Sequence, residues 1–491
     1  MKAALGGLLL VLFALSAGVA EILPGQAVSW SEFSHVTCIA IGYDYAYFGT
    51  TEGILRYHRF DRQWNDPITV SDGLQGKAIR RLAVSFDDQE LTVETDQGIF
   101  TYDKNLESWF LEPEFPTENY RDSRPTPPLP RLLMPTGFQM YPEGFIEDSY
   151  FRQHAITAWL DDGFGAIFVG TWGLGAAWID TRDYSADLLP CGLLQKETDA
   201  IYIEGDSIWL GGNAGDRNPE FPDARYGVTL YDRRDQTFTY FEPRYINGFD
   251  SEIIYDIAGD PKNLYFAGRN GLTVLGRKDE RYFTMTRRDG LPDDETTALA
   301  IGHDSVWVGT TDGLALYTPS VDTIFVVGKD LLGGKFITDL ESAGGRLIIG
   351  TTKGAFYIDL ARQKIGRLRD PQGNLGGLIR HISTNGDEAL ISSDYGLTIV
   401  NLTTGKSTPA PYVDPAGGAY AAVATDKYLA AVVDRGLMLI NRQTGKERLF
   451  TEDDGLLSVK IHAMVIDGDY LWLGSEDGLT RFYWLNPARV D

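Results

Sequence analysis

Short runs of alternating apolar and polar residues recur along most of this chain. The clearest example is residues 306–317, VWVGTTDGLALY, in which two alternating runs flank the turn Thr311, Asp312 and Gly313. Strict alternation over four to eight residues is typical of a half-buried strand. A glycine supplies the positive φ that a tight turn between two strands needs. The motif therefore predicts a β-hairpin.

Variants of this hairpin occur ten times. The last glycine of the turn aligns at Gly53, Gly98, Gly175, Gly227, Gly271, Gly313, Gly354, Gly396, Gly436 and Gly478. The regular spacings run from 40 residues (436−396) to 45 residues (98−53). A period near 42 with four short strands per unit is that of a propeller blade, whereas helical repeats would carry apolar residues three and four apart. The sequence predicts an all-β propeller of four-stranded antiparallel blades.

The two ends of the chain predict how the propeller closes. Residues 26–33 read as an outermost strand without its own blade, and the C-terminal end supplies three strands, at 461–466, 470–473 and 479–484. A shared terminal blade would pair both edges and favours one closed ring of all ten repeats. Propellers usually have four to eight blades. Two smaller rings, or seven to eight regular blades with divergent repeats attached, are the alternatives.

Two insertions interrupt the repeats. The spacing of 77 residues (175−98) includes a proline-rich segment at about 111–150, and the hairpin turn of the fourth repeat is lengthened to 212–226. Proline at this density removes ladder donors, so we expect 111–150 to leave the ring without forming a ladder. In a four-stranded meander, the connection into the next blade and the second turn lie on the same face. Both insertions should therefore rise from one face.

The first twenty residues predict export. Lys2 precedes an apolar core, and the small residues Gly18 and Ala20 stand at the −3 and −1 positions of a cleavage site. Residues 1–20 are expected to be a signal peptide and 21–491 the propeller domain, in the periplasm or secreted. After residue 20, no apolar run approaches the roughly 18 residues of a membrane-spanning helix, so no direct membrane insertion is expected.

Composition narrows the partners. The formal net charge of −25 disfavours nucleic acid and anionic lipid. Cys38 and Cys191 should be far apart in a ring, so we expect free, buried thiols. The six histidines show no metal-ligand spacing, so no metal or cofactor is predicted.

The repeats resemble those of the two-component regulator propeller family. Its W-V-G-T hairpin is matched at 306–317 and, in a common variant, at 170–175, and its later G-L-P element is matched at 289–292, 72–74 and 454–456. The resemblance implies antiparallel blades and extracytoplasmic binding of a ligand or partner. Well-known members are sensory ectodomains that respond to oligosaccharides and are followed by an immunoglobulin-like domain, a membrane span and a kinase. Those parts have no counterpart in this sequence, so direct transmembrane signalling by this chain is not expected.

No sequence motif for a nucleophile, a zinc protease or a phosphate loop is present. Function is expected in the residues that break the repeat, since repeat proteins place specificity in the loops of one face. The ligand-binding candidates are Tyr141, Phe145, Trp172, Arg217, Asn218, Phe221, Arg225, Tyr226, Arg269 and Asn270.

These aromatic, arginine and asparagine side chains suit stacking and hydrogen bonding. They favour an exported, non-catalytic propeller that binds an envelope protein or a glycan (oligosaccharide) through the inserted face. One alternative is a carbohydrate-active hydrolase or lyase, which would need two suitably spaced carboxylates near Trp172. Another is a ligand-sensing subunit of a separate membrane signalling protein. The insertions could also simply pack together and cap the ring.

Overall fold

The computed structural model describes residues 26–118, 120–125, 131–213, 225–410 and 418–485. Within them the strands form ten antiparallel sheets, nine of four strands and one of six, which correspond to the ten repeats. The predicted all-β propeller of antiparallel blades is confirmed. The ten aligned glycines all have positive φ, from 80° at Gly175 to 148° at Gly98. The predicted signal peptide lies outside the described residues.

Blades 1 to 3 form what we call the three-blade unit. Blade 1 contains β2 (Val36–Ile41), β3 (Tyr45–Thr50), β4 (Ile54–His58) and β5 (Gln63–Ile68); blade 2 contains β6 (Ile79–Val84), β7 (Glu90–Thr95), β8 (Ile99–Asp103) and β9 (Ser108–Glu112); blade 3 contains β10 (Phe138–Tyr141), β11 (Phe145–Asp148), β12 (Gln153–Asp161), β13 (Ala166–Thr171), β14 (Ala176–Asp180) and β15 (Ala186–Leu189).

Blades 4 to 10 form the seven-blade ring. Their strands are β16 (Ala200–Glu204), β17 (Ser207–Gly211), β18 (Val228–Asp232) and β19 (Thr237–Phe241) in blade 4; β20 (Ile254–Gly259), β21 (Asn263–Gly268), β22 (Gly271–Gly276) and β23 (Tyr282–Met285) in blade 5; β24 (Thr296–Ile301), β25 (Val306–Thr310), β26 (Gly313–Thr318) and β27 (Thr323–Val327) in blade 6; and β28 (Ile337–Ala343), β29 (Arg346–Thr351), β30 (Gly354–Asp359) and β31 (Lys364–Arg367) in blade 7.

The same ring continues with β32 (Ile379–Asn385), β33 (Glu388–Ser393), β34 (Gly396–Asn401) and β35 (Ser407–Pro409) in blade 8; β36 (Ala421–Ala424), β37 (Tyr428–Val433), β38 (Gly436–Asn441) and β39 (Glu447–Phe450) in blade 9; and β40 (Ile461–Asp467), β41 (Tyr470–Ser475), β42 (Gly478–Tyr483) and β1 (Ala27–Trp30) in blade 10. A single turn of α-helix, α1 (Lys329–Leu332), follows β27.

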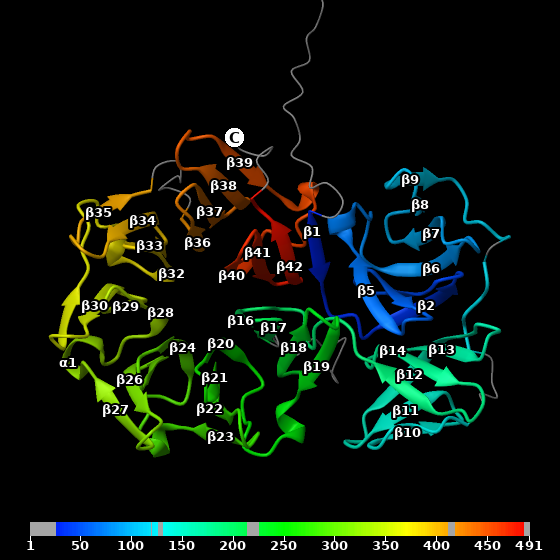
Figure 1. Ribbon diagram of the computed structural model, residues 1–491, viewed down its shortest axis with the longest axis horizontal. Coiled ribbons are helices and arrows are strands. Elements are labelled where there is room, and N and C mark those ends of the chain that lie inside the picture. Colours follow the sequence, from blue (N-terminus) through cyan, green and yellow to red (C-terminus); the bar gives the residue numbers. More distant parts are fainter. Residues whose placement is uncertain (1–25, 119, 126–130, 214–224, 411–417, 486–491) are drawn as a thin grey trace, which may run out of the picture.

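The ring closes between blade 10 and blade 4. The innermost strands β16, β20, β24, β28, β32, β36 and β40 each lie beside the next, and β40 lies beside β16 (Figure 1). The expected ring of ten blades is therefore wrong, and the alternative of seven regular blades with further repeats attached is observed. The reason is the path of the chain. After β1 the chain builds the three-blade unit and then comes back to the end of β1, where Leu193 N donates to Ser31 O over 2.9 Å. Blade 4 therefore begins beside blade 10.

The predicted sharing of one blade by both ends is confirmed. Strand β1 pairs antiparallel with β42, from Ala27 opposite Phe482 to Trp30 opposite Leu479. The Trp30 ring stacks on Trp472 of blade 10, with centroids 5.8 Å apart, and contacts Tyr231 of blade 4 at 5.3 Å. Strand β1 thus completes blade 10 and also fills the seam where the ring closes.

The three-blade unit is arranged around β2, which lies between β6 and β12. Residues 121–124 of the proline-rich insertion join blade 1 to blade 3. The Ser123 hydroxyl accepts from Ile39 N over 3.0 Å, and its carbonyl accepts from Trp159 N over 2.6 Å. One buried core, which includes Phe48, Phe168 and Trp472, runs from this unit into the ring seam.

The expectation that residues 111–150 form no ladder is wrong for their last third. Strands β10 and β11 pair antiparallel and add to β12, which makes blade 3 six-stranded. The prolines permit this because Pro135 precedes the hairpin and Pro142 stands in its turn.

Cys38 and Cys191 are free and buried, as expected. Burial raises the pKa of the Cys38 thiol to about 12. Among the described residues, no helix is long and apolar enough to cross a membrane.

Candidate ligand-binding site

Blade 3 carries a row of aromatic side chains across its sheet. Tyr141 of β10 lies opposite Phe145 of β11, and their rings stack with centroids 4.6 Å apart and planes 13° apart. Phe145 lies opposite Ala155 of β12, and Trp172 N at the end of β13 donates to Ala155 O over 2.8 Å. We call these four residues the aromatic row.

The aromatic row is open to solvent. Trp172 is 38% exposed, Ala155 is exposed, and Tyr141 and Phe145 are half-buried. Neighbouring strands lie about 4.8 Å apart, so Ala155 leaves a gap of roughly 10 Å between the Phe145 and Trp172 positions. The Tyr141 hydroxyl donates to Glu147 over 3.0 Å, which places a carboxylate at one end of the row. Aromatic faces with polar groups beside them suit a flat, hydroxylated or amide-containing ligand.

The Trp172 indole is held on one side by His35. The His35 ring packs edge-on against it, with centroids 4.7 Å apart, and His35 Nδ1 bonds Glu32 at 2.9 Å. Gly173, at φ 104°, follows Trp172 in the turn and passes close to His154. A side chain does not fit there, because its Cβ would lie 2.8 Å from His154 Nδ1. His35 thus restricts the indole on one side, while Trp172 stays 38% exposed to solvent.

Buried charges join blade 3 to blade 4 on the face of the sheet opposite the aromatic row. His154 lies on that face because it precedes Ala155 in β12, and adjacent residues of a strand face opposite ways. Arg152 donates to Asp148 over 2.5 Å and lies 3.5 Å from Glu242, which also accepts from Arg225 at 2.7 Å. We call Asp148, Arg152, Arg225 and Glu242 the ion cluster. Its Arg152, Asp148 and Glu242 side chains are at most 7% exposed.

Two carboxylates that bond the residues packed around Trp172, Asp148 beside His154 and Glu32 beside His35, have lowered pKa values. Burial would raise the pKa of Asp148, but hydrogen bonds from Arg152 and Tyr150 outweigh it and lower the pKa to about 2. Burial likewise opposes the anion of Glu32, yet hydrogen bonds to His35 and Ser34 lower its pKa. A general acid needs a raised pKa, so these two groups lend no support to glycoside hydrolysis.

The remaining candidates divide into three groups. Arg225 belongs to the ion cluster and lies 4.9 Å from the Tyr240 ring, and Tyr226 follows it before β18. Arg217, Asn218 and Phe221 lie outside the described residues. Arg269 and Asn270 lie in blade 5, at the β21–β22 turn, where Asn270 Nδ2 donates to Asp250 O over 2.8 Å.

Arg269 and Asn270 were expected near Trp172, but β18 and β19 of blade 4 lie between that turn and blade 3 (Figure 1). The expectation assumed adjacent blades of one ring. The structure brings Tyr141, Phe145 and Trp172 into one row, links Arg225 to them through the ion cluster, and leaves Arg269 and Asn270 apart.

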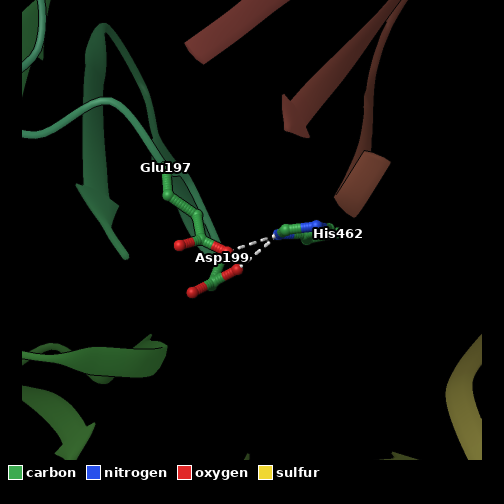
Figure 2. A group of neighbouring side chains, drawn as sticks. All are labelled: Glu197, Asp199 and His462. Atoms are coloured by element: carbon green, nitrogen blue, oxygen red, sulfur yellow. Dashed lines mark hydrogen bonds and ion pairs between the residues drawn. The ribbon is translucent and has the colours of Figure 1, made fainter. Parts of the chain in front are cut away.

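A second polar group lies at the ring seam and was not predicted. His462 Nδ1 lies 2.8 Å from Asp199 Oδ1 and 3.3 Å from Glu197 Oε1 (Figure 2). One imidazole nitrogen and two carboxylate oxygens within 4.8 Å of one another could supply three ligands to a cation such as Zn²⁺. The hydrogen bond to Asp199 raises the pKa of His462, which favours the protonated ring beside the two carboxylates. Sequence spacing gave no signal because 263 residues separate His462 from Asp199.

No family model matches the sequence, and no characterised protein matches it at a significant level. The resemblance to two-component regulator propellers therefore stays a prediction. Among solved structures, the chain is similar to PorZ, described as an essential bacterial surface component of the type IX secretion system of Porphyromonas gingivalis, with a TM-score of 0.62 and 12% identity over 94% of this chain and 87% of that one.

Lower similarity connects the chain to the extracellular domain of a hybrid two-component system from B. thetaiotaomicron, with a TM-score of 0.46 and 13% identity over 91% of this chain and 69% of that one. The computationally designed protein Ika8 also has a TM-score of 0.46, with 16% identity over 68% of this chain and 97% of that one. At such identities the likeness to PorZ is one of fold, and the fold shared is that of a propeller.

Proposed function

We propose that this protein is an exported, envelope-associated β-propeller that binds an oligosaccharide chain along the aromatic row and does not transform it. The aromatic row is the observation that carries the proposal. It offers Tyr141 and Phe145 on neighbouring strands and Trp172 beyond them, with Ala155 leaving an open gap between Phe145 and Trp172. Sugar rings present apolar faces that stack on aromatic rings, and their hydroxyls bond carboxylates such as Glu147.

Rigidity supports binding at this row. Trp172 is packed against His35, and the sheet that carries the row is tied to blade 4 by the ion cluster. A preformed site binds with less loss of conformational entropy than a mobile loop does. The carboxylate at the end of the row, Glu147, accepts from Tyr141, and Glu32 behind Trp172 is bound to His35; neither forms a pair of free carboxylates, which favours binding over catalysis.

The envelope setting is supported by the predicted signal peptide and by the fold shared with PorZ, a bacterial surface component. An envelope protein remains the alternative ligand for the row. An extended peptide would also cross Tyr141, Phe145 and Trp172, so the experiment must separate the two.

The test is calorimetric titration of the purified protein with soluble peptidoglycan fragments, delipidated O-polysaccharide and unstructured peptides of mixed composition. We expect one glycan class to bind, and Trp172→Ala or Tyr141→Ala with Phe145→Ala to weaken it at least tenfold. Phe283→Ala is the matched control because Phe283 is a 43% exposed aromatic of β23, in the ring. Binding that survives both row variants, or binding of peptides alone, would refute the glycan proposal.

A further inference from the structure

The three-blade unit presents a second aromatic surface, built from the turns β2–β3, β6–β7 and β12–β13, which follow the innermost strand of each blade. Each of these three turns carries one aromatic residue: Tyr43 in residues 42–44, Phe86 in 85–89 and Phe164 in 162–165. Phe60, from the β4–β5 turn, completes the group. These four side chains are 50%, 73%, 77% and 60% exposed, respectively.

The same turns in the ring are polar. They consist of residues 205–206, 260–262, 302–305, 344–345, 386–387, 425–427 and 468–469, which contain only Gly, Pro, Asp, Ser, Thr, His and Lys. A surface turn needs no aromatic side chain to form, since polar residues and glycine serve in all seven ring blades. The aromatics of the three-blade unit therefore need another explanation.

The four side chains form one continuous strip. The Tyr43 ring lies 5.8 Å from Phe60 and 5.7 Å from Phe86. The Arg59 guanidinium bridges to the fourth ring, at 5.6 Å from Phe60 and 5.5 Å from Phe164. We call Tyr43, Phe60, Phe86 and Phe164 the aromatic strip.

Buried polar contacts hold the strip in place. Arg59, with a side chain 5% exposed, donates to Asp162 at 2.8 Å and to the carbonyls of Gly42 at 2.8 Å and Tyr43 at 2.7 Å. Asp88 accepts from Asp44 N at 2.7 Å and so joins the blade 2 turn to the blade 1 turn. The turns are cross-linked, and the aromatic rings project from a rigid base.

The strip is large enough for the centre of a protein interface. An aromatic side chain buries on the order of 200 Å² when it is fully covered, so four half to three-quarters exposed rings present about 500 Å². Apolar patches of this size on a monomer are often functional, and rigid aromatic anchors are the usual centres of binding energy.

The charges around the strip indicate the kind of partner. The exposed carboxylates of Asp61 and Asp87 lie in the same turns, and that of Asp161 ends β12 just before the Phe164 turn. The exposed cations nearby are turned to other groups: Arg62 lies over the Trp178 ring at 4.1 Å, Lys104 lies 5.9 Å from the Tyr45 ring, Arg121 donates to Asp161 O, and Arg182 pairs with Asp180. A second copy of this chain would bring the same carboxylates and a net charge of −25, and an anionic lipid surface would also be repelled.

We propose that the aromatic strip is a docking surface for a protein segment that has apolar or aromatic anchors flanked by lysine or arginine. Its anchors would cover the four rings, and its cations would face the three carboxylates. This surface is separate from the aromatic row, so the protein would hold a glycan and a protein partner at once.

The test selects peptides from a random 12-residue phage-displayed library on the wild-type protein after depletion on the Phe86→Ser, Phe164→Ser variant. Both residues are mostly exposed, so the variant should fold. We expect enriched peptides to combine apolar anchors with a positive charge, to bind the variant at least tenfold more weakly, and to weaken as salt rises. The matched control is Phe325→Ser with Val326→Ser, which removes exposed apolar groups of β27 (54% and 51%) and should leave binding unchanged.

The proposal is refuted if no peptide is enriched, if enriched peptides are acidic or neutral, or if they bind the strip variant equally well. Sedimentation and vesicle flotation test the other occupants. Self-association, or flotation with anionic vesicles, that is lost in the strip variant would assign the surface to a second copy or to a membrane instead. Neither result would alter the glycan titration at the aromatic row, so the two proposals can fail separately.

Discussion

The seven-blade ring and the three-blade unit are built from one repeat, but they bury their innermost strands in different ways. In the ring every innermost strand has another innermost strand on each side, and closure comes from the repeat itself. In the three-blade unit, β2 has β6 and β12 as neighbours, and a non-repeating segment around Ser123 bonds to blades 1 and 3. The repeat thus specifies a blade, whereas the number of blades in a ring depends on where the chain brings two blades together.

The turns differ in the same way. Ring blades 4 to 10 have polar turns after their innermost strands, whereas blades 1 to 3 place Tyr43, Phe86 and Phe164 in the turns after β2, β6 and β12. Blade 3 alone adds two strands, β10 and β11, and with them two members of the aromatic row. The closed ring is the regular scaffold, and the irregular unit beside it carries most of the features that suggest binding.

Breaking the ring seam should have the largest effect. Trp472→Ala removes a fully buried ring that stacks on Trp30, and a change of this kind costs about 3–5 kcal/mol of the free energy of unfolding. Hydrogen exchange should show faster exchange in β16 and β40, on the two sides of the seam, with β6 and β7 of the three-blade unit much less affected. Equal loss of protection in all blades would contradict closure at this seam.

Breaking the contact between the two parts should come next. Arg152→Ala leaves Asp148 as a buried anion without its arginine partner, while Glu242 keeps its ion pair with Arg225, and the loss costs about 3 kcal/mol. Denaturant unfolding at pH 7 measures the loss, and glycan binding at the aromatic row should weaken with it. Arg182→Ala is the control, since Arg182 pairs with Asp180 but is 84% exposed and should contribute almost nothing. If both variants lose the same stability, the ion cluster does not secure blade 3.

The blades could be predicted from the sequence because the repeat is local. Gly313 and its nine equivalents each have a positive φ in the hairpin turn. The strands on either side alternate apolar and polar residues in the sequence, as half-buried strands do. The shared blade was also predictable from Trp30 and its neighbours. Ring size was not, since it depends on β40 meeting β16, and no residue pattern records a contact between blades so far apart in sequence.

The candidate site was predictable only in part, for the same reason. Trp172 stood out because its hairpin turn differs from the other nine, and Tyr141 and Phe145 stood out as aromatics in an insertion. Their common row depends on the pairing of β11 with β12. The density of prolines argued against this pairing, but Pro142 lies in the turn and removes no ladder donor. The aromatic strip had a sequence signal that comparison of the first turns of the repeats would have found, whereas His462 and Asp199 had none.

A smaller effect tests how the three-blade unit is held together. Ser123→Ala removes the hydroxyl that accepts from Ile39 N, and the buried amide left without a partner costs about 1–2 kcal/mol. Amide exchange at β2 should accelerate, while the ring strands β24 and β28 keep their protection. Ser305→Ala, in a ring turn, is the matched control. Faster exchange in the ring as well would show that residues 121–124 do not act on the unit alone.

The smallest effect should separate the two parts by pH, because their histidines shift in opposite directions. At the ring seam, the hydrogen bond to Asp199 raises the pKa of His462. In the three-blade unit, burial and the nearby Arg152 charge lower the pKa of His154. A histidine in the unfolded chain has a pKa of about 6.5.

These opposite pKa shifts make the two histidines stabilise the fold in opposite pH ranges. Stability from His462 is fully present below about pH 6.5 and is lost as the pH rises through its raised folded pKa. Stability from neutral His154 is present above about pH 6.5 and is lost as the pH falls through its lowered folded pKa. His462→Gln should therefore destabilise more at pH 5.5 than at pH 8.5, by less than about 1 kcal/mol because the pair is partly exposed. His154→Gln should destabilise more at pH 8.5, and urea unfolding at the two pH values measures both. If the two variants changed with pH in the same direction, the seam and the unit would not differ in the charge state of their histidines.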